Sequence, residues 1–264
     1  MGGIMQENKI LHACVVLPTY NEASNIKQAL DNILSQESKH NNLQVLVVDD
    51  TSPDGTAQVV KEYQKHNPEV HLLLRTEKQG LGAAYIAGMR HALNTFSPDV
   101  IIEMDADGQH DPAEIPHLLE AIRQGADFVI GSRYVKGGST PRTWKASRKL
   151  ISKAANTYTR LILQTGDAKD CTGGFRAIRS EVLKKINLKQ LNVQGYAFQV
   201  ALLNAAVRNG AQVKEIPIAF GARTRGESKM RTRDLIRGGL SLAGIRARQI
   251  TGTTAQRTPS EAEA

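Results

Sequence analysis

Short apolar runs alternate with amphipathic stretches along the first half of the chain. Five runs have the length and the β-branched content of buried strands, at residues 12–17, 43–48, 70–74, 100–104 and 127–130. Between the first two, Ser24 is a candidate cap for a helix that carries Ile26, Leu30 and Ile33 on one face. Further helices are predicted at residues 56–66, 83–94 and 115–124. Strands and helices that alternate through short links form parallel βαβ units, so the pattern predicts an α/β fold with a doubly wound sheet.

The second half has a different pattern. Residues 145–163 predict a basic helix with Trp144 at its entrance, and 173–176 form a tight glycine-containing segment. A helix is predicted at 198–209, and a strand at 213–220, whose Pro217 suits the edge of a sheet.

The net charge of the chain indicates which kinds of partner it can bind. The chain has 34 Lys and Arg against 26 Asp and Glu, a formal net charge of +8, which favours nucleic acid, a membrane surface or a phosphorylated substrate. Only 5% of the residues are aromatic and no stacking platform is visible, so we expect no nucleic acid. Cys14 and Cys171 lack metal-ligand or redox spacing and are expected to be free thiols. No apolar run is long enough to span a bilayer and no signal-peptide core is present, so we expect a soluble chain or one that lies on a membrane.

Acidic residues follow three of the predicted strands. Glu22 follows the first, Asp49 and Asp50 follow the second, and Asp105 and Asp107 follow the fourth. A parallel sheet gathers such strand ends on one edge, and paired carboxylates there suit Mg²⁺ or Mn²⁺ that arrives with substrate phosphates. The alternative for the last pair is a plain polar turn, with Asp111 as the cap before Pro112. The phosphate-binding glycine patterns of dinucleotide and P-loop proteins are absent, and Gly80 is better explained as a helix-entry turn.

Basic residues could complete a site for phosphate groups. Arg133 follows a strand end, Arg148 and Ser152 lie one helical turn apart, and Arg223 and Lys229 share a loop. Each alone is more typical of a solvated surface charge. His110, beside the acids, is expected to support a metal ligand rather than to bind a metal itself.

Eight motifs in order over residues 13–230 resemble the family-2 glycosyltransferases with a GT-A fold, in particular the dolichol- or polyprenol-phosphate mannose synthases. They are V-V-L-P-T-Y-N-E (15–22), V-V-D-D-T-S-P-D-G-T (47–56), E-K-Q-G-L-G-A-A-Y-I-A-G (77–88), M-D-A-D-G-Q-H-D-P (104–112), G-S-R-Y (131–134), D-C-T-G-G-F-R (170–176), G-Y-A-F-Q-V (195–200) and G-E-S-K-M (226–230). The resemblance implies a Rossmann-like, mostly parallel sheet flanked by helices. Together with the residue pattern outside the motifs, it predicts four regions: a polar lead-in (1–9), a GT-A domain (10–230), a basic amphipathic helix (231–250) and a disordered tail (251–264).

The resemblance further assigns roles to residues that match the motifs. The nucleotide-sugar positions are Pro18, Tyr20, Glu22, Val48, Asp50, Asp105, Ala106, Asp107, Arg133, Arg223 and Lys229. Asp105, Asp107 and Gln109 match the metal-binding positions, and Arg148 and Ser152 match the pair that receives the lipid phosphate. Asp105, Asp107 and Arg133 are thus the expected catalytic residues.

The resemblance implies that mannose passes from GDP-mannose to a dolichyl or polyprenyl phosphate, with inversion and with Mg²⁺ or Mn²⁺. Relatives usually carry an acid where this chain has Ala201, and broader relatives an Asn where it has Gln79. The alternatives are the same reaction with UDP-glucose, or a non-catalytic subunit that binds nucleotide sugars. We expect the protein on the cytoplasmic face of a membrane. The helix at 231–250 would lie on that surface, dock on a membrane-anchoring partner subunit, or pack against the domain.

Overall fold

A computed structural model describes residues 10–163, 165–191 and 196–222, together with Gly244 and Arg246. Its strands are β1 (Leu11–Thr19), β2 (Asn41–Asp49), β3 (Val70–Leu74), β4 (Val100–Glu103), β5 (Phe128–Ser132), β6 (Arg176–Arg179) and β7 (Val213–Pro217). Its α-helices are α1 (Ile26–Leu34), α2 (Thr56–Gln64), α3 (Leu81–Thr95), α4 (Ile115–Arg123), α5 (Ala146–Leu163), α6 (Ser180–Lys184) and α7 (Tyr196–Arg208). Single 3-10 turns lie at Pro112–Glu114 and Leu188–Gln190.

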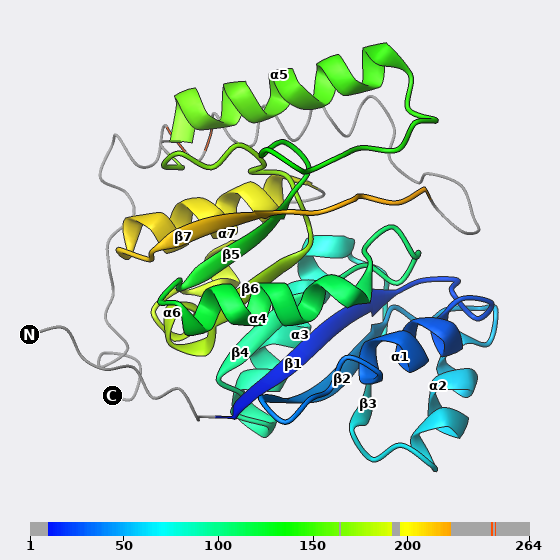
Figure 1. The fold of residues 1–264 in the computed structure, drawn as a ribbon. Helices are drawn as coiled ribbons and strands as arrows, with labels where there is room; N and C mark the ends of the chain where they lie inside the picture. Colours follow the sequence, from blue (N-terminus) through cyan, green and yellow to red (C-terminus); the bar gives the residue numbers. More distant parts are fainter. Residues whose placement is uncertain (1–9, 164, 192–195, 223–243, 245, 247–264) are drawn as a thin grey trace, which may run out of the picture.

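The seven strands form one mostly parallel sheet in the order β3-β2-β1-β4-β6-β5-β7 (Figure 1). This confirms the predicted doubly wound α/β class, and β7 with its Pro217 lies at an edge as predicted. β6 was missed: it is antiparallel to both β4 and β5. The four residues of β6, R-A-I-R, include two charges and give no apolar run, which is why the sequence pattern predicted only a tight segment there.

Both faces of the sheet are covered, because alternate residues of the central strands pack in opposite directions. In β1, Val15 and Leu17 join a core with α1 and α4, whereas Cys14 and Val16 join a core with α3 and α7. Both cysteines are free, as predicted, and both are buried. α5 stands apart from these layers, at one outer end of the molecule (Figure 1).

Some predicted boundaries shift. α1 has Asn25, not Ser24, at its N-cap position and no side-chain cap, because the backbone N–H groups of Asn25 and Ile26 donate to the Glu22 carbonyl instead. Gly80 does open α3, and its φ of 94° is one that glycine tolerates. No described helix combines the length and the apolar character needed to cross a bilayer. The predicted segments 1–9, 231–250 and 251–264 fall outside the described residues, apart from Gly244 and Arg246, which are helical.

Candidate active site

The turns after β1, β2 and β4 meet at one edge of the sheet, which we call the acidic edge. The register pairs Thr19 with Asp49 at the ends of β1 and β2, and Val16 with Glu103 in β1 and β4. Because these strands are parallel, the acids that follow them gather as predicted. They are Glu22, Asp49, Asp50, Asp105 and Asp107.

Asp49 and Asp50 are adjacent but differ in their surroundings. Asp49 is fully buried and accepts hydrogen bonds from the Thr19 hydroxyl at 2.9 Å and the Ser52 backbone N–H at 2.9 Å. Asp50 instead pairs with Arg75, Oδ1 to Nη1 at 2.7 Å. Burial raises the pKa of Asp50, and the charge of Arg75 opposes that shift. Asp49 therefore stabilises the turn, and Asp50 is the acid directed toward charged groups.

The predicted nucleotide residues of β1 and β2 surround this pair. Lys78 lies 3.4 Å from the centre of the Tyr20 ring, and the Glu22 carboxylate accepts from Asn25 Nδ2 at 2.8 Å. The Val48 side chain is fully buried in the core against α3, which leaves only its backbone for a ligand. Sequence reasoning missed Arg75 and Lys78, although both lie in the charged stretch before the predicted glycine turn.

The turn from Asp105 to His110 is fixed by hydrogen bonds from several directions. Tyr85 Oη donates to Asp105 Oδ1 at 3.1 Å, and the Gln109 backbone N–H donates to Asp107 Oδ1 at 3.0 Å. Gln109 Nε2 donates to the Gly221 carbonyl at 3.1 Å, which leaves Oε1 as the acceptor atom of that amide. Asp107 is 6% exposed, so the turn holds its carboxylate in place before any ligand arrives.

His110 also supports this turn. Its Nδ1 accepts the backbone N–H of Asp105 at 3.0 Å, which requires an unprotonated nitrogen. Burial lowers the pKa of His110 to about 4, so the ring is neutral near pH 7 and keeps that acceptor. The ring stacks on Phe175 at 5.0 Å between centroids. His110 therefore positions Asp105.

Asp105 and Asp107 fit a divalent cation that is shared with a substrate. Among the described residues, no group of three or more His, Cys, Asp or Glu could hold a metal ion by itself. Mg²⁺ commonly binds through one or two carboxylates and completes its shell with water and substrate phosphates. Two carboxylates and a fixed Gln109 amide match that chemistry. The capping alternative also holds for Asp111, whose side chain accepts from the Ala113 N–H at 3.0 Å.

A buried ion pair lies beneath the acidic edge. Glu103 and Arg176 are both fully buried, with Oε2 and Nε 3.9 Å apart. Gln199 Nε2 donates to Glu103 Oε1 at 3.3 Å, and burial raises the pKa of Glu103 to about 7. Gln199 lies in α7, two residues before Ala201, the position where relatives usually carry an acid. In this chain the buried acid next to that part of α7 is Glu103, which comes from β4. An acid within the apolar run of β4 was a visible signal that sequence reasoning did not use.

Arg133, which follows β5, is held by Asp170. Arg133 Nε and Nη2 donate to the two carboxylate oxygens at 2.7 Å and 2.6 Å, and its backbone N–H donates to Oδ2 at 2.9 Å. The pKa of Arg133 is raised, because the hydrogen bonds and charge of Asp170 outweigh the opposing effect of burial. Glu215 of β7 accepts the backbone N–H of Asp170 at 2.9 Å and so fixes that loop. Sequence reasoning placed Asp170 in a motif but gave it no role.

Aromatic rings connect the acidic edge to the start of α5. His110 contacts Phe220 at 5.4 Å, and Phe220 contacts Trp144 at 5.9 Å between centroids. The Arg148 guanidinium lies over Trp144 at 4.1 Å, and that of Arg133 lies 6.0 Å from the same ring. The structure therefore brings the predicted residues Arg133 and Arg148 to one ring.

Ser152 joins the same group through a neighbour of Arg133. The Tyr134 hydroxyl donates to Ser152 Oγ at 2.6 Å. One turn further along α5, Asn156 Nδ2 donates to Thr172 Oγ1 at 3.4 Å, and that hydroxyl also accepts from Arg133 Nη2 at 3.1 Å. α5 is thereby tied to the Arg133–Asp170 pair.

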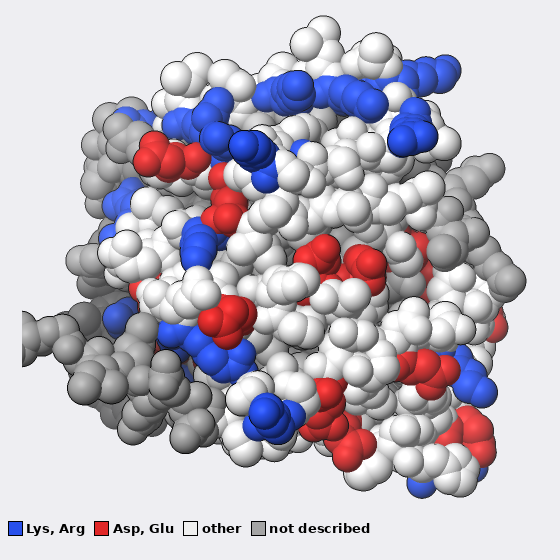
Figure 2. Space-filling view, viewed as in Figure 1, with Lys and Arg blue, Asp and Glu red and all other residues white. Residues whose placement is uncertain are grey.

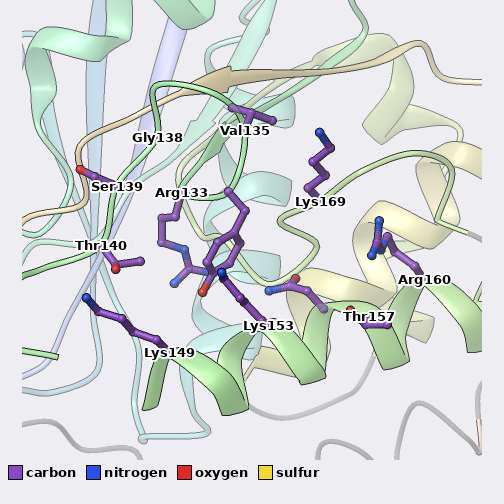
Figure 3. Close-up of a pocket in the computed structure, with 12 residues that line it drawn as sticks. Arg133, Val135, Gly138, Ser139, Thr140, Lys149, Lys153, Thr157, Arg160 and Lys169 are labelled. Atoms are coloured by element: carbon purple, nitrogen blue, oxygen red, sulfur yellow. The ribbon is translucent and has the colours of Figure 1, made fainter. Parts of the chain in front are cut away.

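A cavity of about 600 Å³ lies between α5 and the loop after β5 (Figure 3). Its lining includes no Asp or Glu. Five basic residues line it: Arg133, Lys149, Lys153, Arg160 and Lys169. We call it the cationic cavity. Figure 3 shows Lys149, Lys153 and Arg160 along α5, with Arg133 on the facing loop and Lys169 on a separate segment. Such a lining suits an anionic ligand, and arginine offers a planar fork for phosphate oxygens.

The glycine-containing segment before β6 connects the acidic edge with the cationic cavity. A Cβ added at Gly174 would lie 3.8 Å from Asp105 Oδ2 and 3.7 Å from Gln199 Nε2. Asp170, four residues earlier, holds Arg133 of the cationic cavity. The predicted residues Arg223 and Lys229 lie outside the described part of the chain.

Comparison with known proteins agrees with this geometry. The sequence model of Glycosyl transferase family 2 matches residues 14–187. The polyprenol monophosphomannose synthase of Mycolicibacterium smegmatis is 46% identical over 217 residues, which cover 82% of this chain and 80% of that protein. The undecaprenyl-phosphate mannosyltransferase of Micrococcus luteus is 44% identical over 220 residues, 83% of this chain and 88% of that one. Among solved structures, glucosyl-3-phosphoglycerate synthase from Mycobacterium tuberculosis, in complex with Mn²⁺, UDP and glucosyl-3-phosphoglycerate, has the same fold. Its TM-score is 0.65 at 18% identity, and the match covers 92% of this chain and 80% of that one.

Proposed function

The chain belongs to glycosyl transferase family 2, and from this membership we propose that it transfers mannose from GDP-mannose to a polyprenyl or dolichyl phosphate at the cytoplasmic face of a membrane. One observation carries the proposal: a carboxylate turn and the cationic cavity lie at the same edge of the sheet. The first suits a nucleoside diphosphate with its cation, and the second suits a phosphate acceptor. The names of the two bacterial relatives support the choice of sugar and acceptor.

The acidic edge is the proposed donor site. Tyr20, Glu22 and Asp50 would surround the nucleotide, with Arg75 and Lys78 beside them. Asp105, Asp107 and Gln109 would hold Mg²⁺ or Mn²⁺, and the Mn²⁺ in the solved complex of the same fold supports a divalent ion. When bound, such an ion neutralises the charge that develops on the leaving diphosphate.

The transfer is a single displacement. An oxygen of the acceptor phosphate forms a bond to the anomeric carbon of mannose while the bond from that carbon to the β-phosphate oxygen breaks, and GDP leaves. A phosphate monoester has a second pKa of about 6, so the acceptor is mostly ionised near neutral pH and needs little help from a base. Glu103 is fully buried and Ala201 carries no acid, which agrees with a reaction that depends on positioning.

The cationic cavity is the proposed acceptor site. Arg133, which the resemblance assigns to the nucleotide sugar, lines this cavity, and we place it beside the acceptor as well. Because Asp170 fixes it, Arg133 can present its remaining N–H groups to a phosphate without losing conformational freedom on binding. Arg148 and Ser152 border the same region through Trp144 and Tyr134. Lys149 and Lys153 extend this set beyond the residues predicted from sequence.

A transfer assay tests the proposal. Purified chain is mixed with radiolabelled GDP-mannose, a polyprenyl phosphate in detergent, and Mg²⁺ or Mn²⁺; a parallel reaction contains labelled UDP-glucose. We expect label in the lipid phase from GDP-mannose only, and its loss on chelation of the metal. Label only from UDP-glucose would show that the donor is UDP-glucose and not GDP-mannose. If neither donor supports transfer while nucleotide binding is intact, the chain is a non-catalytic subunit that binds nucleotide sugars.

A further inference from the structure

α5 carries four of its six large apolar residues exposed, whereas Ile162 and Leu163 at its C-terminal end pack against the core. Three of its 18 residues are buried, and two of those are polar, Asn156 and Thr159. Its exposed large apolar residues are Leu150, Ile151, Tyr158 and Leu161, with exposed fractions of 69%, 52%, 40% and 76%. They are four of the seven large hydrophobic residues exposed in the described part of the chain. A surface helix of a globular protein has the opposite arrangement, with the apolar stripe turned inward.

These residues form one continuous face. Leu150, Ala154, Tyr158 and Leu161 follow the i, i+4, i+8, i+11 spacing that places residues on one side of a helix. From Leu150 to Leu161 the face is about 16 Å long, at 1.5 Å per residue. The opposite face carries Asn156, which is bonded to Thr172 beside the cationic cavity. The helix therefore has a polar side against the site and an apolar side toward its surroundings.

The charge around this face identifies what can cover it. Between residues 128 and 166 the sequence has eight Lys and Arg and no Asp or Glu. Figure 2 shows a band of basic side chains across the part of the molecule where α5 lies in Figure 1, with uncharged side chains among them. Two copies of so basic a face would repel each other, whereas an anionic surface would attract it.

We propose that the outer face of α5 lies on an anionic lipid bilayer, with its apolar side chains at the boundary between headgroups and acyl chains. The inference rests on the proposed function, because a polyprenyl phosphate is held in a bilayer by its hydrocarbon chain. The same helix then meets the bilayer on one side and lines the acceptor cavity on the other. This assigns membrane docking to α5, a helix other than the one predicted at 231–250.

Vesicle sedimentation with the full chain tests the docking. The vesicles are phosphatidylcholine alone, or phosphatidylcholine with about one third phosphatidylglycerol, without acceptor or nucleotide sugar. We expect binding to the anionic vesicles to be about tenfold stronger, and the double variant Leu150→Gln/Leu161→Gln to lose about tenfold. The matched control, Ile10→Gln/Leu74→Gln, removes two apolar side chains of 42% and 48% exposure elsewhere and should bind within about twofold of wild type. Wild-type binding by the α5 variant, or no preference for anionic vesicles, would overturn the proposal.

Site-specific labels show which segment touches the lipid. Both native cysteines are fully buried, so an introduced surface cysteine can be labelled selectively. An environment-sensitive dye at Ala154→Cys, on the outer face of α5, should shift to the blue when vesicles are added. The same dye at Lys61→Cys on α2 should not shift. An unchanged Ala154→Cys emission with bound vesicles would assign docking to another segment and overturn the proposal.

The two proposals fail in different experiments. Transfer to a detergent-solubilised acceptor tests the chemistry and needs no bilayer, whereas the sedimentation assay contains no acceptor and tests docking alone. With a short-chain, water-soluble acceptor, we expect Leu150→Gln/Leu161→Gln to keep wild-type turnover. Sedimentation velocity completes the test: a wild-type dimer that this variant disperses, without vesicle binding, would show self-association instead and overturn the proposal.

Discussion

The acidic edge and the cationic cavity belong to one candidate site but are held by different kinds of structure. The acidic edge grows directly out of β1, β2 and β4, and Asp49, Asp50 and Asp107 are each at most 6% exposed. The cationic cavity lies outside the sheet, between a loop and α5, and three of the 18 residues in α5 are buried. The proposed donor site, which would orient a diphosphate, is thus built into the core, while the proposed acceptor site, which would meet a lipid, lies at the surface.

The largest effect should come from the acidic edge. We expect Asp107→Ala to lower transfer by about a thousandfold, because it removes a carboxylate proposed to bind the metal. The free energy of unfolding should fall by only about 1 kcal/mol, the value of its hydrogen bond from the Gln109 N–H. Asp111→Ala is the matched control, since Asp111 also accepts one local backbone N–H. It should lose similar stability and keep its transfer rate. Equal transfer by the two variants would contradict the donor assignment.

Asp170→Asn should affect the cationic cavity nearly as strongly. It leaves the Arg133 charge, only 10% exposed, without its carboxylate partner. The free energy of unfolding should fall by about 3 kcal/mol, and transfer by about a hundredfold. Chemical denaturation and the transfer assay measure the two effects. Asp167→Asn, three residues away on an exposed position, should change neither. An active, stable Asp170→Asn variant would show that Arg133 needs no fixed orientation.

The lysines of α5 should separate acceptor from donor binding. We expect Lys149→Gln/Lys153→Gln to raise the KM for the lipid phosphate by about tenfold, through the loss of two charges from the cavity. The KM for the nucleotide sugar should stay unchanged. The control is Lys61→Gln/Lys65→Gln, a pair with the same spacing at α2. If the KM for the nucleotide sugar rises instead, the cavity binds the donor and not the acceptor.

Thiol labelling of the native protein compares how tightly the two regions are packed and needs no substitution. Burial raises the pKa of Cys14 to about 12 and also raises the pKa of Cys171, so neither thiol should react while the structure stays closed. Cys14 lies in the central strand β1, whereas Cys171 adjoins the Arg133–Asp170 pair. We expect Cys171 to be labelled about tenfold sooner, through local opening near α5. Equal rates, measured by mass spectrometry of the labelled peptides, would mean that both regions open together.

The sequence predicted the acidic edge better than the basic region, for a physical reason. The strands before Glu22, Asp50 and Asp105 are continuous apolar runs, and parallel strands bring their ends together without further information. β6 escaped prediction because two of its four residues are arginines, and the burial of Arg176 depends on a distant partner, Glu103.

The roles that sequence missed depend on contacts between distant segments. Asp170 acts by holding Arg133, 37 residues earlier in the chain, and no local pattern reports such a pair. α5 was predicted as a basic helix, but only the structure shows that most of its large apolar residues face outward. The roles predicted for Arg223, Lys229 and the helix at 231–250 remain predictions.

The antiparallel strand β6 has a consequence for how this enzyme family could change its acceptor. Ile130 of β5 pairs with Arg176 of β6, so the whole segment from Arg133 to Phe175 leaves and re-enters the sheet at neighbouring positions. This segment is a cassette whose two ends are joined by the pairing of β5 with β6. It contains α5, the lysines of the cationic cavity and Asp170. Gly174 and Phe175 at its end lie against Asp105 and His110, so a cassette of different length and polarity that ends before Gly174 could be grafted there without disturbing the proposed donor turns. The proposed acceptor site would then be exchangeable as a module, while the acidic edge stayed the same.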